Sequence, residues 1–189
     1  MEFVQPIRNK KQLEAMKKML KASNMRDYCM FVMGINSGLR ISDLLGLTIG
    51  DVMDVNGKVR DRITIREQKT GKCKDFPISD SARKAISEYM RTHLNVSQSD
   101  VLFASRKGNK AISRQQAWKI INAAATTVGI TDEIGTHTMR KTFGYHAYQS
   151  GVDISLIQKL LNHSAPSITL RYIGITQDQL DDVYLNLNL

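Results

Sequence analysis

The sequence predicts a mixed α+β fold that is predominantly helical and contains one small antiparallel β-sheet. Apolar residues recur at helical spacing through most of the chain, first at Leu13, Met16 and Leu20. Strand-like alternation is confined to residues 62–66, and a polar glycine turn follows it. A chain of 189 residues can bury a substantial core, and we expect a single domain over residues 1–175.

Two helices and a bend are predicted near the N-terminus. Periodicity indicates helices over residues 10–22 and around residues 28–35, and Gly38 is placed to end the second helix. Ser42 can cap a short turn that follows, through Leu45. Arg40 would then lie in the bend between two helices, which is a favourable place to hold a phosphate group.

A β-hairpin and a helix are expected next. The alternation at residues 62–66, the polar turn at residues 69–72 and the segment at residues 75–78 to which it leads predict two antiparallel strands with Lys69 near the tip. A helix is expected over residues 82–93, followed by a long polar connection over residues 95–110.

The C-terminal third is predicted to be helical throughout. Ser113 and Gln116 form a capping-box pattern before a helix that runs to about residue 128, in which Trp118 and Ile121 are expected to belong to the core. Thr136 is expected to cap a helix that carries the next two motif residues. Further helices are predicted from residue 154 to near residue 163, and from Pro166 onward.

The composition limits the classes of partner and compartment. Lys and Arg number 27 against 18 Asp and Glu, so the formal net charge is +9, which favours a polyanionic partner and nucleic acid above all. A basic surface that serves only solubility is the alternative. No apolar run is long enough to cross a membrane, and the first residues do not resemble a signal peptide. Cys29 and Cys73 form no CxxC pair, so we predict no disulfide framework, no zinc site and a cytoplasmic protein.

Five residues from four short motifs suggest a site for metal-free attack on a phosphodiester. Arginines can form two parallel bonds to phosphate oxygens, histidines can donate or accept protons, and a tyrosine hydroxyl can act as the nucleophile. Because His137 and Arg140 are three residues apart on a predicted helix, they would share one face. The set is Arg40, His137, Arg140, His163 and Tyr172.

The ordered motifs resemble the catalytic domain of the tyrosine recombinases, also called the phage integrase family. They read SGLRISDLLGL at residues 37–47, QKTGK at 68–72, HTMRKTF at 137–143, LNHS at 161–164 and TLRY at 169–172. Each fragment alone is weak, but the ordered set with a terminal tyrosine is a strong signal. The resemblance covers nearly the whole chain and implies the tyrosine-recombinase catalytic fold.

The resemblance also implies a reaction. Tyr172 would attack a DNA phosphodiester and form a 3′-phosphotyrosine with a free 5′-hydroxyl, without a metal or any other cofactor. Arg40 and Arg140 would bind the nonbridging oxygens, and His163 would donate a hydrogen bond to the phosphate. Lys69 would protonate the leaving oxygen, and His137 would assist deprotonation of the tyrosine or orient the phosphate.

Two of these assignments have a structural alternative. Lys69 could be a solvated turn lysine. Asp43 stands where the family has an acidic residue, which would orient an arginine or histidine of the site. A simple capping role in the turn near Ser42 is the alternative for Asp43.

The implied enzyme is a site-specific DNA recombinase or integrase, of the kind that serves mobile elements. Its partner would be double-stranded DNA, on which the family acts as a homotetramer, and a monomer is expected without DNA. Contacts with DNA are predicted for a basic and polar set, with solvated surface charge as the alternative: Arg106, Lys107, Lys110, Arg114, Gln115, Lys119, Lys141 and Arg171.

Domain organisation and two alternative functions complete the expectations. Family members usually carry an N-terminal core-binding domain, and none is expected ahead of Arg8. Residues 176–189 are expected to form a tail helix that docks on its own domain or is exchanged between protomers. A type IB topoisomerase and a catalytically silent DNA-binding regulator are the alternative functions.

Overall fold

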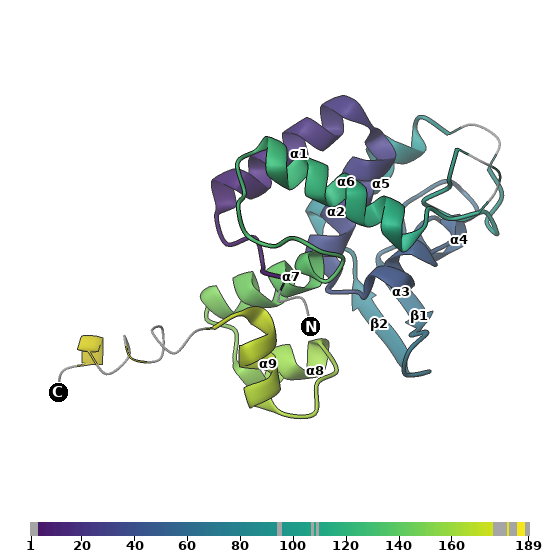
Figure 1. Cartoon of the computed structure of the whole chain (residues 1–189). Helices are drawn as coiled ribbons and strands as arrows, with labels where there is room; N and C mark the ends of the chain where they lie inside the picture. The colour runs from purple at the N-terminus through teal and green to yellow at the C-terminus, as the bar shows by residue number, and fades with distance from the viewer. Residues whose placement is uncertain are drawn as a thin grey trace.

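The computed structural model describes residues 4–93, 96–106, 108, 110–175, 181 and 185–187. Within them the chain is predominantly helical and contains one two-stranded antiparallel sheet, so the predicted fold class is confirmed (Figure 1). None of the helices in this part of the chain is long and apolar enough to cross a membrane. Lys107 and most of the predicted tail helix lie outside the described residues.

The main body is a set of helices around α2. Helix α2, Met25–Ser37, packs against α1, Lys10–Ser23, against α5, Asp80–Met90, and against α7, Thr138–Gln149. Helix α6, Arg114–Thr127, packs against α1 and starts with the predicted cap, because the Ser113 side chain accepts a hydrogen bond from Gln116 N. Because α2 has neighbours on several sides, it is buried over most of its circumference rather than along one stripe.

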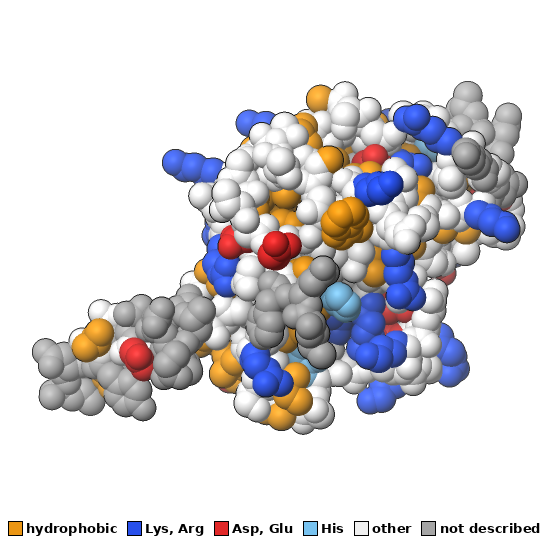
Figure 2. Space-filling model, viewed as in Figure 1, with side chains coloured by type: hydrophobic (Ala, Val, Ile, Leu, Met, Phe, Trp, Pro, Cys, Tyr) orange, Lys and Arg blue, Asp and Glu red, His pale blue; other side chains and the backbone are white. Residues whose placement is uncertain are grey.

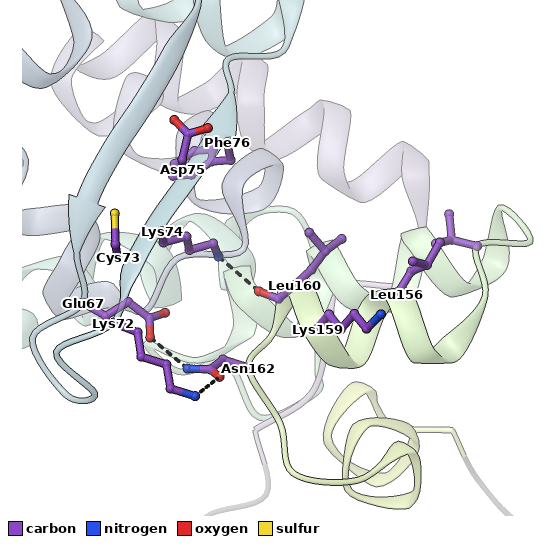
Figure 3. Close-up of a pocket in the computed structure, with 11 residues that line it drawn as sticks. Glu67, Lys72, Cys73, Lys74, Asp75, Phe76, Leu156, Lys159, Leu160 and Asn162 are labelled. Carbon is purple, nitrogen blue, oxygen red and sulfur yellow. Dashed lines mark hydrogen bonds between the residues drawn. The ribbon is translucent and has the colours of Figure 1, made fainter.

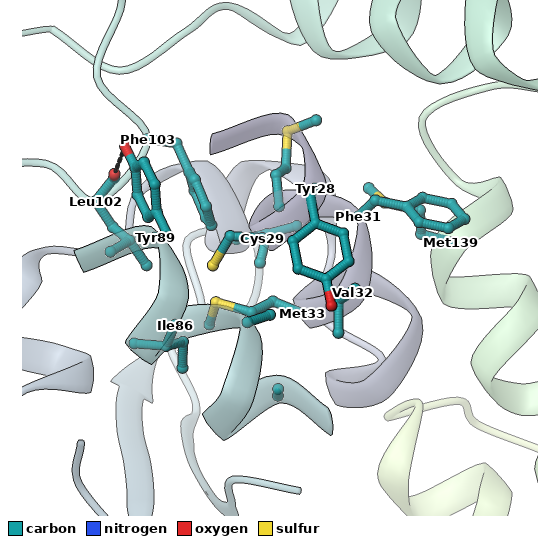
Figure 4. Packing of buried hydrophobic residues seen from close by; sticks show 14 of the residues in the cluster. Tyr28, Cys29, Phe31, Val32, Met33, Ile86, Tyr89, Leu102, Phe103 and Met139 are labelled. Carbon is teal, nitrogen blue, oxygen red and sulfur yellow. Dashed lines mark hydrogen bonds between the residues drawn. The ribbon is translucent and has the colours of Figure 1, made fainter. Parts of the chain in front are cut away.

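The core lies between α2 and α5. Cys29, Phe31 and Met33 of α2 are fully buried. In Figure 4, Cys29 and Met33 lie on the side of Ile86 and Tyr89 of α5, whereas Phe31 lies beside Met139 of α7. Two apolar residues of the long connection, Leu102 and Phe103, also belong to this core and are buried. The Tyr89 hydroxyl donates a hydrogen bond of 2.9 Å to the Leu102 carbonyl. The connection over residues 96–106 is therefore anchored by burial.

A tight bend ends α2 and begins the functional region. Gly38 has a φ of +60°, and a Cβ there would lie 2.6 Å from a ring carbon of Phe143, so both its conformation and its surroundings require glycine. Two short helices follow, α3 at Ile41–Leu45 and α4 at Ile49–Val52. Arg40 is the N-cap residue of α3, which confirms that it lies in a bend between helices.

The hairpin consists of β1, Arg62–Arg66, and β2, Cys73–Pro77. Arg62 pairs with Pro77 and Arg66 pairs with Cys73, so residues 67–72 form the turn. Lys69 is exposed in that turn, as predicted.

A second, smaller core holds the C-terminal helices together. Helices α8, Ile154–Leu160, and α9, Pro166–Ile173, pack on each other and on α7. Their shared core contains Tyr145, Ile157, Leu161 and Ile173. Figure 1 shows α7, α8 and α9 together at one end of the molecule, beside the hairpin.

Four local predictions were wrong. The N-cap residue of α3 is Arg40 and Ser42 lies inside that helix, so Ser42 does not cap it. Helix α7 begins at Thr138 with His137 as its N-cap residue, so Thr136 does not cap it. Helix α8 ends at Leu160, because the chain turns into a left-handed conformation at Asn162. Trp118 is 45% exposed, whereas Ile121 is fully buried. Helical spacing alone does not show how wide a stripe the neighbouring helices cover, and the covered stripe of α6 excludes Trp118.

Candidate active site

Arg40 is held by a carboxylate that the motifs did not single out. Its Nη1 lies 2.9 Å from Oε1 of Glu67, and the two side chains are 16% and 2% exposed. The other carboxylate oxygen of Glu67 accepts hydrogen bonds from Thr70 Oγ1 at 2.6 Å and from Asn162 Nδ2 at 3.2 Å. Burial raises the pKa of Glu67, but these three partners together outweigh burial and leave the pKa below its ordinary value. Glu67 is therefore ionised at neutral pH and fixes the guanidinium.

Arg140 is the largest fully buried side chain among those that the structure describes. It lies on α7, and main-chain carbonyls hold it from two sides. Its Nη1 donates to the Gly38 carbonyl at 2.5 Å, and its Nη2 donates to the Leu161 carbonyl. The bend after α2 and the end of α8 thus orient the Arg140 guanidinium together, although these two segments are far apart in the sequence. This arrangement leaves little freedom to the side chain.

The tyrosine hydroxyl lies beside a ring nitrogen. The Tyr172 hydroxyl is 3.4 Å from Nδ1 of His137, and the Lys141 ammonium lies over the Tyr172 ring at 5.2 Å from its centre. Burial raises the pKa of Tyr172, against the opposing effect of Arg140 and Arg40. The phenol is therefore protonated at neutral pH and needs a proton acceptor before it can attack.

His137 is suited to accept that proton. Its pKa is lowered by burial and then by the positive charges of Arg140, Lys141, Arg40 and Lys69. A lowered pKa keeps the imidazole neutral at pH 7, so one ring nitrogen is available as an acceptor.

His163 also packs against the ring of Tyr172. The two ring centres are 4.8 Å apart with the planes inclined by 70°. Nδ1 of His163 lies 3.1 Å from Thr169 Oγ1, and that hydroxyl donates to the Ala165 carbonyl at 3.3 Å. Burial, followed by the charges of Arg140 and Arg40, lowers the pKa of His163 to about 4. The ring is thus neutral at neutral pH.

Asp43 is buried and supports the hairpin turn. Its Oδ1 accepts a hydrogen bond of 2.9 Å from the main-chain N–H of Gln68. The structure therefore differs from the expected contact with an arginine or histidine. The acidic partner of Arg40 is Glu67, and Asp43 holds the chain next to Lys69.

A second lysine of the hairpin, Lys74 of β2, contacts the end of α8. Lys74 Nζ donates to the Leu160 carbonyl at 3.2 Å. Burial and the charge of Arg140, in that order, lower the pKa of Lys74 to about 8. Sequence reasoning missed Lys74 and Glu67. The only signal for them was their position beside the QKTGK motif, since their contacts depend on how the hairpin meets α8.

The predicted DNA-contact residues fall into two groups. Most are exposed: Arg106, Lys110, Arg114, Gln115, Lys119 and Arg171. Lys141 is different, because it is only 8% exposed and lies over the Tyr172 ring, so it belongs to the interior of the site rather than to an open surface. Figure 2 shows Lys and Arg side chains gathered over the hairpin and around a histidine on one face of the molecule.

Together these side chains can hold a singly charged phosphate and expose it to a nucleophile. Two guanidiniums and two neutral imidazoles lie around one tyrosine hydroxyl, which provides anion binding, proton transfer and nucleophilic attack. Such a site needs oxygen ligands that carry negative charge, and a phosphodiester fits that description.

Comparison with known proteins gives a consistent answer. Residues 7–178 match the phage integrase family. The chain is similar to the probable integrase/recombinase YoeC of Bacillus subtilis, with 45% identity over 97% of each protein. It is also similar to the tyrosine recombinase XerD of Corynebacterium glutamicum, with 32% identity over 85% of this chain and 52% of XerD. Among solved structures, the XerH site-specific recombinase bound to its difH DNA superposes with a TM-score of 0.74 at 20% identity, covering 96% of this chain and 52% of XerH.

Proposed function

Because this chain belongs to the phage integrase family and is a tyrosine recombinase, we propose that it cuts and rejoins DNA strands with Tyr172 as the nucleophile. The observation that carries the proposal is the position of the Tyr172 hydroxyl, 3.4 Å from His137 Nδ1 and within the field of Arg140 and Arg40. The similarity to YoeC extends over nearly the whole of both proteins, whereas the chain spans about half of XerD.

In the proposed cleavage step, the Tyr172 oxygen attacks phosphorus and gives its proton to His137. The bond between phosphorus and the 5′-oxygen breaks, and Lys69 supplies the proton that this oxygen takes up. The products are a 3′-phosphotyrosine and a free 5′-hydroxyl. Arg40 and Arg140 bind the nonbridging oxygens and stabilise the additional charge of the pentacoordinate transition state.

Reversal of this step explains how strands are joined. The phosphotyrosine retains the energy of the phosphodiester, so a 5′-hydroxyl from another strand can attack it with the proton transfers reversed. Lys69 then accepts a proton, and the tyrosine leaves. Recombination between two sites requires four such active sites, so we propose a homotetramer on DNA and a monomer without it. Residues 1–175 would form the catalytic domain, and residues 176–189 would exchange between protomers.

The basic side chains of α6 and the connection before it are proposed to contact DNA. Arg114, Gln115 and Lys119 are exposed at the start of α6, which packs on α3 next to Arg40. Phosphate contacts from this face would orient the duplex, and Gln115 could reach base edges in a groove. Because its substrate is DNA, we place the activity in the cytoplasm.

The proposal is tested with nicked duplexes from the DNA that flanks the gene. Loss of the short fragment beyond the nick makes cleavage irreversible, so the covalent intermediate accumulates. The intermediate can then be digested with a protease, and its peptides can be identified by mass spectrometry. Attachment of a nucleotide to the peptide that contains Tyr172 is the expected result. A nucleotide attached to another residue would contradict the assignment, and addition of a free 5′-hydroxyl strand distinguishes strand transfer from relaxation alone.

A further inference from the structure

Asn162, the residue before His163, has an unusual backbone conformation. Asn162 has a φ of +50°, and it is the one non-glycine residue with positive φ among those that the structure describes. Asparagine tolerates this left-handed region better than most residues, but glycine adopts it with less strain. The presence of asparagine at a position that suits glycine suggests that its side chain has a task.

The side chain of Asn162 joins two residues of the hairpin. Its Nδ2 donates to Oε2 of Glu67 at 3.2 Å, and its Oδ1 accepts from Lys72 Nζ at 3.2 Å. Figure 3 shows both contacts, with Asn162 between the hairpin turn and the end of α8. The Asn162 amide thus donates to the first residue of the turn, Glu67, and accepts from the last residue, Lys72.

Through Glu67 the contact reaches Arg40. Glu67 is 3% exposed, and its other oxygen pairs with Arg40 Nη1 at 2.9 Å. The carboxylate therefore has its orientation set by Asn162 and Thr70 on one oxygen and presents the second oxygen to the guanidinium. A buried carboxylate that loses one such donor can rotate toward its remaining partners.

The main chain around Asn162 reaches the other arginine. The preceding residue, Leu161, offers its carbonyl to Arg140 Nη2, and the following residue is His163. One residue earlier, the Leu160 carbonyl accepts from Lys74 Nζ, which adds a second connection between β2 and this segment. Asn162 thus lies where contacts to Arg40, Arg140 and the hairpin turn converge.

We propose that Asn162 is a positioning residue that orients Arg40 through Glu67 and holds the Lys69 turn through Lys72. This inference rests on the proposed function for its effect on rate. Its structural part, the connection between α8 and the hairpin, does not depend on that function.

The first variant is Asn162→Gly, which keeps the left-handed backbone available and removes only the side-chain contacts. We expect the rate of adduct formation on a nicked duplex to fall by at least about tenfold, because an arginine that contacts the transition state is less well placed. Affinity for the duplex should stay within about twofold, since no charge is removed. Asn56→Gly, in an exposed turn before β1, is the matched control and should leave the rate unchanged.

A second variant guards against a loss of folding. Asn162→Asp keeps the acceptor for Lys72 but replaces the donor to Glu67 with a second carboxylate, so adduct formation should slow here too. Rates within about twofold of the unmodified protein for both variants would overturn the role assigned to Asn162.

Hydrogen exchange in the DNA-free protein separates this inference from the proposed function. Residues 67–72 should exchange faster in Asn162→Gly than in the unmodified protein, while α2 should not change. The turn is about 90 residues away in sequence, as the Lys72–Asn162 contact shows, so the added glycine cannot act on it locally. Unchanged exchange in the turn would overturn the connection. Failure of the unmodified protein to form an adduct would count against the proposed function alone.

Discussion

Nη1 of Arg40 lies 2.9 Å from Oε1 of Glu67, and Glu67 has almost no exposed surface. A buried pair of this kind contributes little net stability compared with apolar side chains, but removal of one partner leaves an uncompensated charge. The pair is therefore more informative about function than about stability. It shows that Arg40, one of the two arginines proposed to bind phosphate, is already oriented in the DNA-free protein.

Glu67→Gln should destabilise the protein, because Arg40 would lose its counter-charge in a buried place. The free energy of unfolding should fall by roughly 3 kcal/mol, measured by urea denaturation. The control is Glu14→Gln, which breaks the Lys17–Glu14 pair, where the Glu14 side chain is 60% exposed. That control should cost no more than about 0.5 kcal/mol. Equal losses in the two variants would show that the Arg40–Glu67 pair is not buried as described.

His163 should titrate at an unusually low pH. Its ring signals in the proton NMR spectrum of the DNA-free protein should have a midpoint at about 4, against an ordinary value of 6.5. Since the unfolded chain binds this proton at higher pH than the folded chain, His163 should reduce stability as pH falls from 6.5 to 4. A bound phosphodiester should raise the midpoint, because a nearby negative charge favours the imidazolium. A midpoint near the ordinary value without DNA would contradict the burial of His163 beside Tyr172 and the effect of the two arginine charges on its pKa.

Lys74 should make the free energy of unfolding depend on pH in the alkaline range. Its pKa of about 8 in the folded protein lies below the ordinary 10.5, so between these values the unfolded chain holds a proton that the folded chain lacks. Stability should therefore rise with pH across that window, by up to about 1.4 kcal/mol per pH unit. Urea denaturation of the unmodified protein and Lys74→Met at several pH values isolates the effect. Parallel profiles would mean that the Lys74 ammonium is solvated.

Trp118 offers a direct probe of the proposed DNA face. It is the single tryptophan of the chain, it is 45% exposed, and it shares α6 with Arg114 and Lys119. Binding of duplex DNA should quench its fluorescence or shift the emission to shorter wavelength as water leaves the indole. The change should weaken with added salt, since lysine and arginine contacts release counterions. An unchanged spectrum at saturating DNA would place the duplex elsewhere.

The sequence was informative wherever a local pattern determines structure. Gly38, Ser113 and Pro166 mark helix boundaries through the conformations and hydrogen bonds that they allow, and the structure has boundaries beside each of them. The hairpin was likewise predictable from alternation and its polar turn. The motif residues could be named because their order and type resemble a known family.

The supporting contacts could not be predicted, because they depend on packing between distant segments. Glu67 meets Arg40 only through the way the hairpin turn lies against the bend after α2. The conformation of Asn162 depends on α8 stopping short of the predicted end, and the exposure of Trp118 depends on which neighbours cover α6. Asp43 could be matched to the acidic position of the family, but its hydrogen bond to the Gln68 main chain depends on where the hairpin lies.

Tyr172→Phe tests most directly whether the Tyr172 hydroxyl is the nucleophile. The substitution removes one hydroxyl and preserves the ring that packs against His163. We predict that the variant forms no covalent adduct with a nicked duplex and binds that duplex with an affinity within about twofold of the unmodified protein. Adduct formation by Tyr172→Phe, measured on a denaturing gel beside the unmodified protein, would contradict the account.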